Sequence, residues 1–278
     1  MFFIEILKAI AQGVVQGITE WLPVSSTGHI LLLDAVWKMN ASAAFFDVFK
    51  VIIQLGSIMA VVVLYWGKLN PFCGKKTAAE KKGTWVLWSK VAVASIPAAI
   101  AGLALDDLID GVLSTPVVIA AALIVYGIAF IIMESRKNRN IAVNTVEDIT
   151  YKHAFGIGAF QMLALIPGTS RSGSTILGAS LLGTSRTVAA EFSFFMAIPV
   201  MLGASGLKLV DALFLDDVTF SSEEWILLGV ATVVSFLVSL LVIRGLMAFI
   251  KKHSFKPFGW YRIVLGAVVL GCVAMGWL

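Results

Sequence analysis

Long apolar stretches alternate with short polar segments along the chain. Six of these stretches reach the ~20 residues that a helix needs to cross a ~30 Å hydrocarbon core. They cover residues 45–66, 85–105, 112–133, 186–208, 225–250 and 257–278. None shows the roughly ten-residue alternation of an outer-membrane β-barrel. The pattern therefore predicts an all-α polytopic membrane protein with about six transmembrane helices.

Two other apolar segments are interrupted by polar residues. Residues 2–37 are broken from Pro23 to His29, and residues 153–185 are broken from Pro167 to Ser174. The pieces on either side are mostly too short to cross a membrane. Irregular backbone is tolerated at membrane depth only where protein or a water-filled cavity surrounds it. We therefore predict that both segments are re-entrant helical hairpins.

Charged residues orient the predicted bundle. Residues 67–84 carry five lysines against one acid, and residues 251–256 carry three more lysines. Loops of this kind are typically cytoplasmic, so the acidic loops at residues 106–110 and 211–224, which lack basic residues, are assigned to the outside. Each half then has one hairpin and three crossings. An odd number of crossings turns the second half upside down, which predicts an inverted-topology repeat.

Sequence matches between the halves support this repeat. The predicted halves cover approximately residues 1–140 and 150–278 of a single membrane domain. At a constant offset of 145 residues, Gly13, Gln16, Ser25 and Gly28 correspond to Gly158, Gln161, Ser170 and Gly173. An inverted repeat brings the two hairpin tips together near the membrane midplane from opposite sides.

Composition agrees with the membrane class. The chain of 278 residues is 59% hydrophobic and 14% charged, with a mean hydropathy of +0.94, which is outside the range of soluble domains. The net charge is +4, but the charged residues are unevenly placed and indicate membrane topology, so no nucleic-acid partner is expected. Glu5 and Lys8 interrupt the first apolar stretch, which argues against a cleavable signal peptide. Cys73 and Cys272 are expected to be free thiols.

The two hairpin tips carry the candidate chemistry. The first reads QGITEWLPVSSTGH and the second PGTSRSGST, and both are dense in hydroxyl residues and glycine where a short helix begins. Backbone N–H groups and hydroxyls can converge there on an oxyanion, and the planar fork of Arg171 suits phosphate oxygens. Glu20 and His29 can move protons or hold a metal. The structural alternative is that the polar residues only cap or kink helices.

These strings resemble a known family. EWLPVSSTGH and PGTSRSGST, together with IIQLGSI at residues 52–58 and EFSFFMAIP at residues 191–199, are similar to the bacterial undecaprenyl-diphosphate phosphatases, also called bacitracin resistance proteins. The resemblance covers essentially the whole chain. The family's first motif is an acid or glutamine, three residues, and a glutamate, which correspond here to Gln16 and Glu20.

The resemblance implies an activity and a setting. The expected reaction converts undecaprenyl diphosphate to undecaprenyl phosphate and inorganic phosphate, which recycles the lipid carrier for peptidoglycan synthesis. The expected setting is the bacterial inner membrane, with the active site open to the extracytoplasmic side. The resemblance also implies a divalent metal, Mg²⁺ or Ca²⁺, for which Glu20 is the candidate ligand. A homodimer is compatible with the sequence.

Each candidate residue receives a predicted role. Ser26 is the candidate nucleophile, and His29 is expected to take its proton or to protonate the leaving group. Arg171 is expected to hold the phosphates and neutralise developing charge. Gln16 supports Glu20, which positions a metal or water. The other predicted phosphate-binding residues are Ser25, Thr27, Gly28, Ser170, Ser172, Gly173 and Thr175.

Several alternatives stay open at this point. In one mechanism a metal-activated water attacks directly, and Ser26 only donates a hydrogen bond. The rival function is a polyprenyl-phosphate transporter or flippase, because inverted repeats with broken helices are typical of transporters. Aromatic residues at segment ends, such as Tyr261, look like interface anchors.

Overall fold

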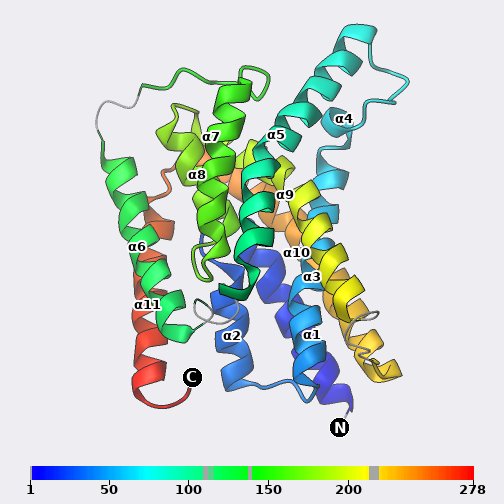
Figure 1. Ribbon diagram of the computed structural model, residues 1–278, viewed down its shortest axis with the longest axis vertical. Helices are drawn as coiled ribbons and strands as arrows, with labels where there is room; N and C mark the ends of the chain where they lie inside the picture. The colour runs from blue at the N-terminus through cyan, green and yellow to red at the C-terminus, as the bar shows by residue number, and fades with distance from the viewer. Residues whose placement is uncertain (1, 109–112, 114, 137–139, 213–218) are drawn as a thin grey trace.

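The computed structural model describes residues 2–108, 113, 115–136, 140–212 and 219–278. Throughout these ranges the regular structure is helical, and most of the helices run along the long axis of the molecule (Figure 1). The helices are α1 (Phe2–Thr19), α2 (Ser26–Val36), α3 (Ala43–Leu64), α4 (Trp66–Leu69), α5 (Ala78–Leu108), α6 (Pro116–Ser135), α7 (Tyr151–Met162), η2 (Leu163–Leu165), α8 (Arg171–Leu181), α9 (Arg186–Val210), α10 (Ser222–Ile250) and α11 (Lys256–Ala274).

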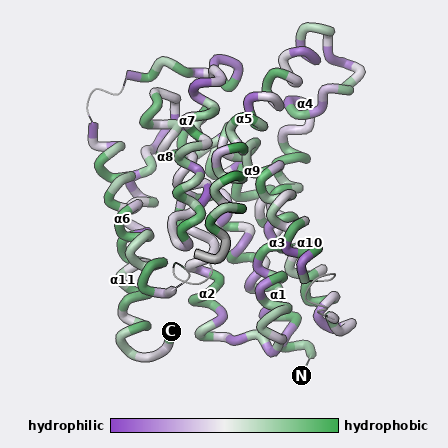
Figure 2. Tube along the Cα trace, in the orientation of Figure 1, coloured by the Kyte–Doolittle hydropathy of each residue, from purple (hydrophilic) through white to green (hydrophobic). Residues whose placement is uncertain are grey.

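Seven helices within the described ranges are long and apolar enough to cross a membrane. Six of them, α3, α5, α6, α9, α10 and α11, overlap the six predicted stretches, which confirms the all-α polytopic class. Apolar residues predominate along these helices (Figure 2). The seventh is α1, which belongs to the first predicted hairpin. Its 18 residues rise about 27 Å, but the chain then reverses and α2 returns toward the same end (Figure 1).

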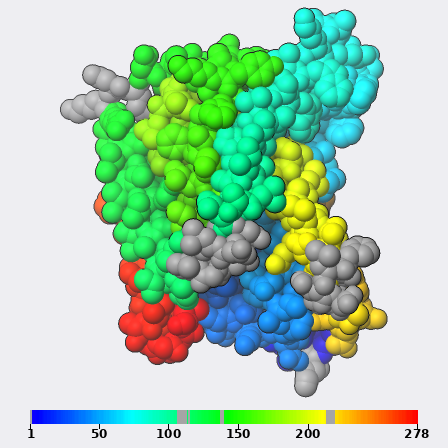
Figure 3. Space-filling view, viewed as in Figure 1, coloured from blue at the N-terminus to red at the C-terminus, as the bar shows by residue number. Residues whose placement is uncertain are grey.

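Some predicted boundaries are wrong. Residues 67–84 were expected to form a loop, but α4 lies in this segment and α5 already begins at Ala78. The basic segment therefore projects as a partly helical hairpin beyond the rest of the molecule (Figure 3). The start of the predicted 112–133 stretch and much of the two acidic loops, at residues 109–112 and 213–218, lie outside the described residues.

The two helical hairpins enter from opposite ends of the molecule. Helices α1 and α2 occupy the end that carries the N-terminus, whereas α7 and α8 occupy the opposite end (Figure 1). Both returning helices begin earlier than predicted, at Ser26 and Arg171. Ser25 and Ser170 cap these helices one position upstream. The polar residues that follow the caps therefore lie in the first helical turn.

The two capping serines share an unusual backbone geometry. Ser25 has φ 73° and Ser170 has φ 72°, a left-handed conformation that non-glycine residues rarely adopt. The Ser25 hydroxyl accepts a hydrogen bond from the N–H of Gly28, and the Ser170 hydroxyl accepts one from the N–H of Gly173. These residues correspond at the offset of 145. The same turn is thus built at both tips, while the boundaries of the two repeat halves stay a prediction.

Glycines let each hairpin lie close to a helix of the other half. Helix α1 packs against α10, and α7 packs against α5. A Cβ atom at Gly13 would lie 2.6 Å from the carbonyl oxygen of Ala231, and one at Gly158 would collide with the carbonyl of Ala94. Gly13 and Gly158 are also a matched pair at the repeat offset. Each hairpin therefore packs closely against a helix of the other half, and this packing brings the two tips together.

Candidate active site

Glu20 lies at the centre of the contact between the two tips. Glu20 is the residue directly after α1, and its side chain is buried, with 5% of the residue exposed. Oε1 accepts a hydrogen bond from Arg171 Nη2 at 2.9 Å. Oε2 accepts one from Gln16 Nε2 at 2.9 Å and one from the Ser26 hydroxyl at 3.0 Å. One carboxylate thus joins residues of both hairpins that the sequence had singled out.

Arg171 is the first residue of α8 and connects the second tip to the first. Besides its ion pair with Glu20, Nη1 donates to the backbone oxygen of Ser193 on α9 at 2.8 Å. The guanidinium carbon lies 5.7 Å from the centre of the Trp21 ring, a cation–π contact. Nε is buried and finds no acceptor among the described residues. The guanidinium therefore contacts both hairpins, and its Nε retains a donor without a partner.

The structure corrects the expected pairing of Ser26 with His29. Ser26 donates to Glu20, whereas the His29 ring turns toward two other groups. Nδ1 lies 2.7 Å from the Ser25 carbonyl oxygen, and Nε2 lies 2.7 Å from the hydroxyl of Tyr261. The reason is local, since His29 stands four residues after Ser25 and its ring folds back onto the carbonyl of the cap. In this arrangement the base next to Ser26 is the carboxylate.

Two hydroxyls of the second tip bond to groups around Glu20 and Arg171. Ser172 donates to the backbone oxygens of Glu20 at 3.0 Å and Leu22 at 3.2 Å. Thr175 is fully buried, donates to the Arg171 carbonyl at 2.9 Å and lies 2.6 Å from the Ser193 hydroxyl. Both residues were predicted to bind phosphate, but their hydroxyls are used within the protein. Their contacts help to position Arg171 and Glu20, and phosphate binding by these two residues stays a prediction.

The remaining predicted phosphate ligands belong to the first turns of α2 and α8. The Ser25 and Ser170 hydroxyls serve as caps for the N–H groups of Gly28 and Gly173. The Thr27 side chain is exposed. The leading N–H groups of a helix have no intrahelical acceptor, so each tip still presents donors to an anion at its first turn.

Arg262 on α11 was missed by the sequence reading. It is fully buried, and its guanidinium donates to backbone oxygens of both tips. The bonds reach Pro23 at 3.1 Å, Gly168 at 3.0 Å and Thr169 at 2.9 Å. A single charged residue inside the apolar stretch 257–278 was the available signal, because buried charges in membrane helices are rarely without a role. The same helix supplies Tyr261, which was interpreted as an interface anchor but reaches His29.

The oxygen atoms around Glu20 fit a hard divalent cation. Gln16 is fully buried, and its Oε1 has no hydrogen-bond partner within the part of the chain that the structure describes. The Ser26 hydroxyl is a further oxygen close by. The described residues contain no group of three or more His, Cys, Asp or Glu side chains that could hold a metal. Mg²⁺ commonly binds through one or two carboxylates together with substrate phosphates, so these donors suit an ion shared with a substrate.

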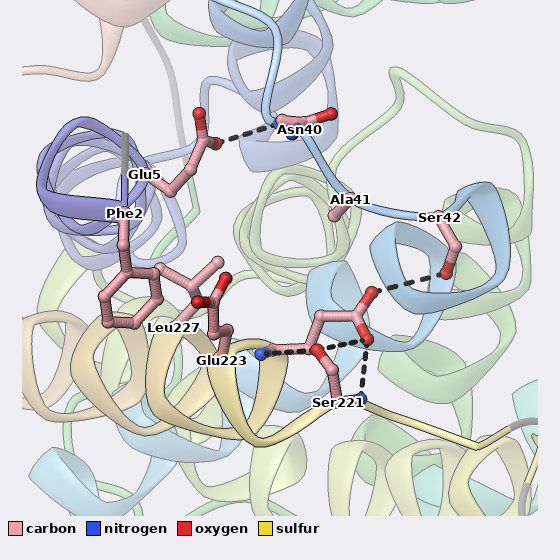
Figure 4. Close-up of a pocket in the computed structure, with 9 residues that line it drawn as sticks. Phe2, Glu5, Asn40, Ala41, Ser42, Ser221, Glu223 and Leu227 are labelled. Atoms are coloured by element: carbon pink, nitrogen blue, oxygen red, sulfur yellow. Dashed lines mark hydrogen bonds between the residues drawn. The ribbon is translucent and has the colours of Figure 1, made fainter.

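A separate acidic pocket lies at the N-terminal end of the molecule (Figure 4). Two of its carboxylates are already paired: Glu5 accepts from the N–H of Asn40 at 2.8 Å, and Glu224 accepts from Ser221. None of the tip residues lines it. The chemistry therefore centres on the contact between the two tips.

The fold and the site define a polytopic membrane protein in which a buried acid–arginine pair joins two opposed helical hairpins. The chain belongs to the bacitracin resistance protein BacA family, whose sequence model matches residues 9–268. Similar chains carry the name undecaprenyl-diphosphatase. One from Enterococcus faecalis is 55% identical over 273 residues, which is 98% of each chain. Undecaprenyl-diphosphatase 1 of Clostridioides difficile is 57% identical over 96% of each chain. The Acetivibrio thermocellus relative is 53% identical over 96% of this chain and 97% of its own.

Proposed function

We propose that this chain is an undecaprenyl-diphosphatase. It hydrolyses undecaprenyl diphosphate to undecaprenyl phosphate and inorganic phosphate, which recycles the lipid carrier for peptidoglycan synthesis and gives resistance to bacitracin. Full-length relatives of this name support the proposal. The observation that carries it is the Glu20 carboxylate, held between the hydroxyl of Ser26 and the guanidinium of Arg171.

The geometry favours Ser26 as the nucleophile. Its Oγ attacks the terminal phosphorus, its proton passes to Glu20 at 3.0 Å, and the bond to the bridging oxygen breaks, releasing the lipid monophosphate. Arg171 neutralises the charge that develops on the phosphoryl oxygens. Water then attacks the phosphoserine, Glu20 returns its proton to the departing Oγ, and inorganic phosphate leaves. Ser26 and Glu20 end the cycle in their starting states.

A divalent ion, Mg²⁺ or Ca²⁺, is part of the proposal. Glu20 and Gln16 are the residues that would hold it. Its contribution when bound is to neutralise part of the charge of the diphosphate. Chelation followed by addition of single metals tests this requirement, and full turnover in the presence of excess chelator contradicts it.

The proposed orientation places the site toward the outside of the inner membrane. Basic residues gather at the α4 end of the molecule, which the positive-inside rule assigns to the cytoplasm. The hairpin with Glu20 and Ser26 is rooted at the opposite end (Figure 1). A membrane-impermeant diphosphate analogue given to sealed spheroplasts should release phosphate into the medium. Hydrolysis only in inverted vesicles, with labelling of Cys73 from the cytoplasmic face as the orientation control, contradicts this assignment.

Phosphate release separates the proposed enzyme from a transporter. Two opposed broken hairpins also occur in transporters, so the fold alone favours neither function. Purified protein is given undecaprenyl diphosphate in detergent, and inorganic phosphate is measured for wild type and Glu20→Gln. Release by wild type and a severe loss in Glu20→Gln support the phosphatase. Binding without release supports a polyprenyl-phosphate transporter. The homodimer stays a prediction.

A further inference from the structure

A basic pocket lies at the end of the molecule that carries α4 (Figure 1). Its volume is about 760 Å³, and it is formed by α4, the first turns of α5 and residues 146–147. All residues of both hairpin tips are described, and none of them lines this pocket. The charged lining residues are Lys68, Lys76, Lys82, Lys90, Glu80 and Glu147. With four lysines against two glutamates, the pocket is positively charged and separate from the candidate active site.

Two of the lysines already have partners inside the protein. The Lys68 ammonium lies 2.5 Å from a carboxylate oxygen of Glu191 on α9. The Lys76 ammonium donates to the backbone oxygens of Lys68 and Asn70 at 3.1 Å and 2.9 Å. It also donates to the Thr84 hydroxyl at 2.6 Å, which ties the segment after α4 to α5. These contacts shape one wall of the pocket.

The other two lysines keep their charge available. Within the part of the chain that the structure describes, neither Lys82 nor Lys90 forms an ion pair. Lys90 is buried, with 8% of the residue exposed, and its ammonium donates to the backbone oxygen of Glu147 at 2.8 Å. An ammonium group has three donors, so two of them find no acceptor among the described residues. A buried cation without a counter-charge is unfavourable, which indicates an anionic ligand in this pocket.

Two tryptophans place the pocket at the level of the lipid headgroups. Trp66 follows the end of α3 and is 56% exposed, and Trp85 lies near the start of α5 and is 55% exposed. Exposed tryptophans at the ends of membrane-spanning helices lie at the boundary between hydrocarbon and headgroups. Along α5, Lys82 lies about 4.5 Å before Trp85 and Lys90 about 7.5 Å after it. A lysine just inside this boundary extends its ammonium toward the headgroups, so both cations reach the same layer.

We propose that this pocket binds the phosphate of an anionic phospholipid headgroup. Lys82 and Lys90 supply the charge, and Ala79, Val86 and Leu87 line the pocket with apolar surface for the glycerol and the first acyl carbons. Lys82, Val86 and Lys90 are spaced four residues apart and therefore share one face of α5. Basic clusters beside a membrane-spanning helix attract anionic lipids in general, and the pocket makes this attraction a defined site. The inference is independent of the proposed hydrolysis.

The first test compares an anionic with a zwitterionic lipid. Purified protein in detergent is titrated with fluorescent phosphatidylglycerol and, separately, with fluorescent phosphatidylcholine, whose choline group cancels the charge of the phosphate. Phosphatidylglycerol should bind at least about fivefold more tightly, since each basic residue near a membrane surface contributes about that factor. Equal affinity for the two probes overturns the proposal.

Matched variants separate the pocket from the general charge of this end of the molecule. Lys82→Gln should weaken phosphatidylglycerol binding about fivefold, and the double variant Lys82→Gln, Lys90→Gln about 25-fold. Lys75→Gln, Lys81→Gln removes the same charge from the same region, but neither residue lines the pocket. Because charges outside the pocket are screened, this control should stay within about twofold of wild type. Equal losses in the two double variants show a diffuse attraction and overturn the site.

Folding and soluble anions are controlled separately. Lys82 is exposed, so Lys82→Gln tests the site without disturbing buried packing, and every variant is checked for a monodisperse profile in detergent. Unchanged affinity in a monodisperse Lys82→Gln protein contradicts the proposal, even if the Lys90 variant does not fold. Millimolar inorganic phosphate is the competitor and should leave phosphatidylglycerol bound, because the pocket also contacts apolar parts of the lipid. Displacement by inorganic phosphate assigns the pocket to a soluble anion and overturns the lipid assignment.

Discussion

Replacing Arg262 with methionine should separate the two hairpin tips. Methionine has a similar length but donates no hydrogen bond, so the backbone oxygens of Pro23, Gly168 and Thr169 lose a charged donor at 2.9–3.1 Å. A buried acceptor left without a partner costs about 1–3 kcal/mol. Taking the lower bound for each of the three, because water and backbone movement relieve part of the penalty, Arg262→Met costs about 3 kcal/mol.

The assays measure stability and activity together. For a chain of this size, a loss of about 3 kcal/mol in stability lowers Tm by roughly 6–12 °C. Tm is measured as the temperature at which half of the protein no longer stays monodisperse after heating in detergent. Phosphate release should fall further than stability alone explains at temperatures where the variant is folded, since Glu20 and Arg171 are brought together by the same tips. Arg262→Lys should be intermediate, because one ammonium cannot reach three carbonyls as a planar fork does.

A matched control tests whether the loss of stability is specific to the buried arginine. Arg244 is an exposed arginine on α10, so Arg244→Met should shift Tm by no more than about 1 °C. If Arg262→Met behaves like this control in both Tm and turnover, the guanidinium does not hold the tips and the reasoning above is refuted.

The site residues give further outcomes. Arg171→Lys should lower kcat by about 10²-fold or more at constant charge, because a point charge does not replace the fork; the measurement is phosphate release, and near-normal turnover removes Arg171 from the phosphate contacts. Glu20→Gln should be severely impaired, whereas Gln16→Glu should stay active and need a lower metal concentration, since a second carboxylate binds a divalent cation more tightly than an amide does; the reverse ranking means that the wrong acid was assigned. Ser26→Ala should lose nearly all turnover and form no phosphoenzyme, and substantial residual hydrolysis counts against the covalent route.

The fold was largely predictable because apolar length is a strong signal. The six crossing helices follow from stretches that must span hydrocarbon, and their observed ends differ by only a few residues in most cases. The starts of α2 and α8 were placed too late, since a serine cap in a left-handed turn leaves little trace in hydropathy. The early start of α5 was missed for a related reason. Lysines are good helix formers, but we interpreted a charged segment outside the membrane as a loop.

The site was predictable as a set of residues but not as a network. Glu20, Ser26 and Arg171, which the structure brings into contact, were singled out because polar groups inside a membrane segment are expensive. Their partners depend on contacts between distant parts of the chain: Arg171 is 151 positions from Glu20, and Tyr261 is 232 positions from His29. No local pattern encodes such contacts. The assignment of the Ser26 proton to the carboxylate therefore came only from the structure.

The ion pair between the tips links folding to catalysis. Glu20 belongs to one hairpin and Arg171 to the other, and each would be an uncompensated buried charge without its partner, a cost of several kcal/mol. The pair therefore favours docking of both hairpins. In the proposed reaction, a substrate phosphate competes with Glu20 for the guanidinium. Once Arg171 turns to the phosphate, Oε1 loses its cationic donor, and the carboxylate becomes better able to accept the proton of Ser26 on Oε2. Binding of the anion would thus activate the base at the moment when the nucleophile needs it.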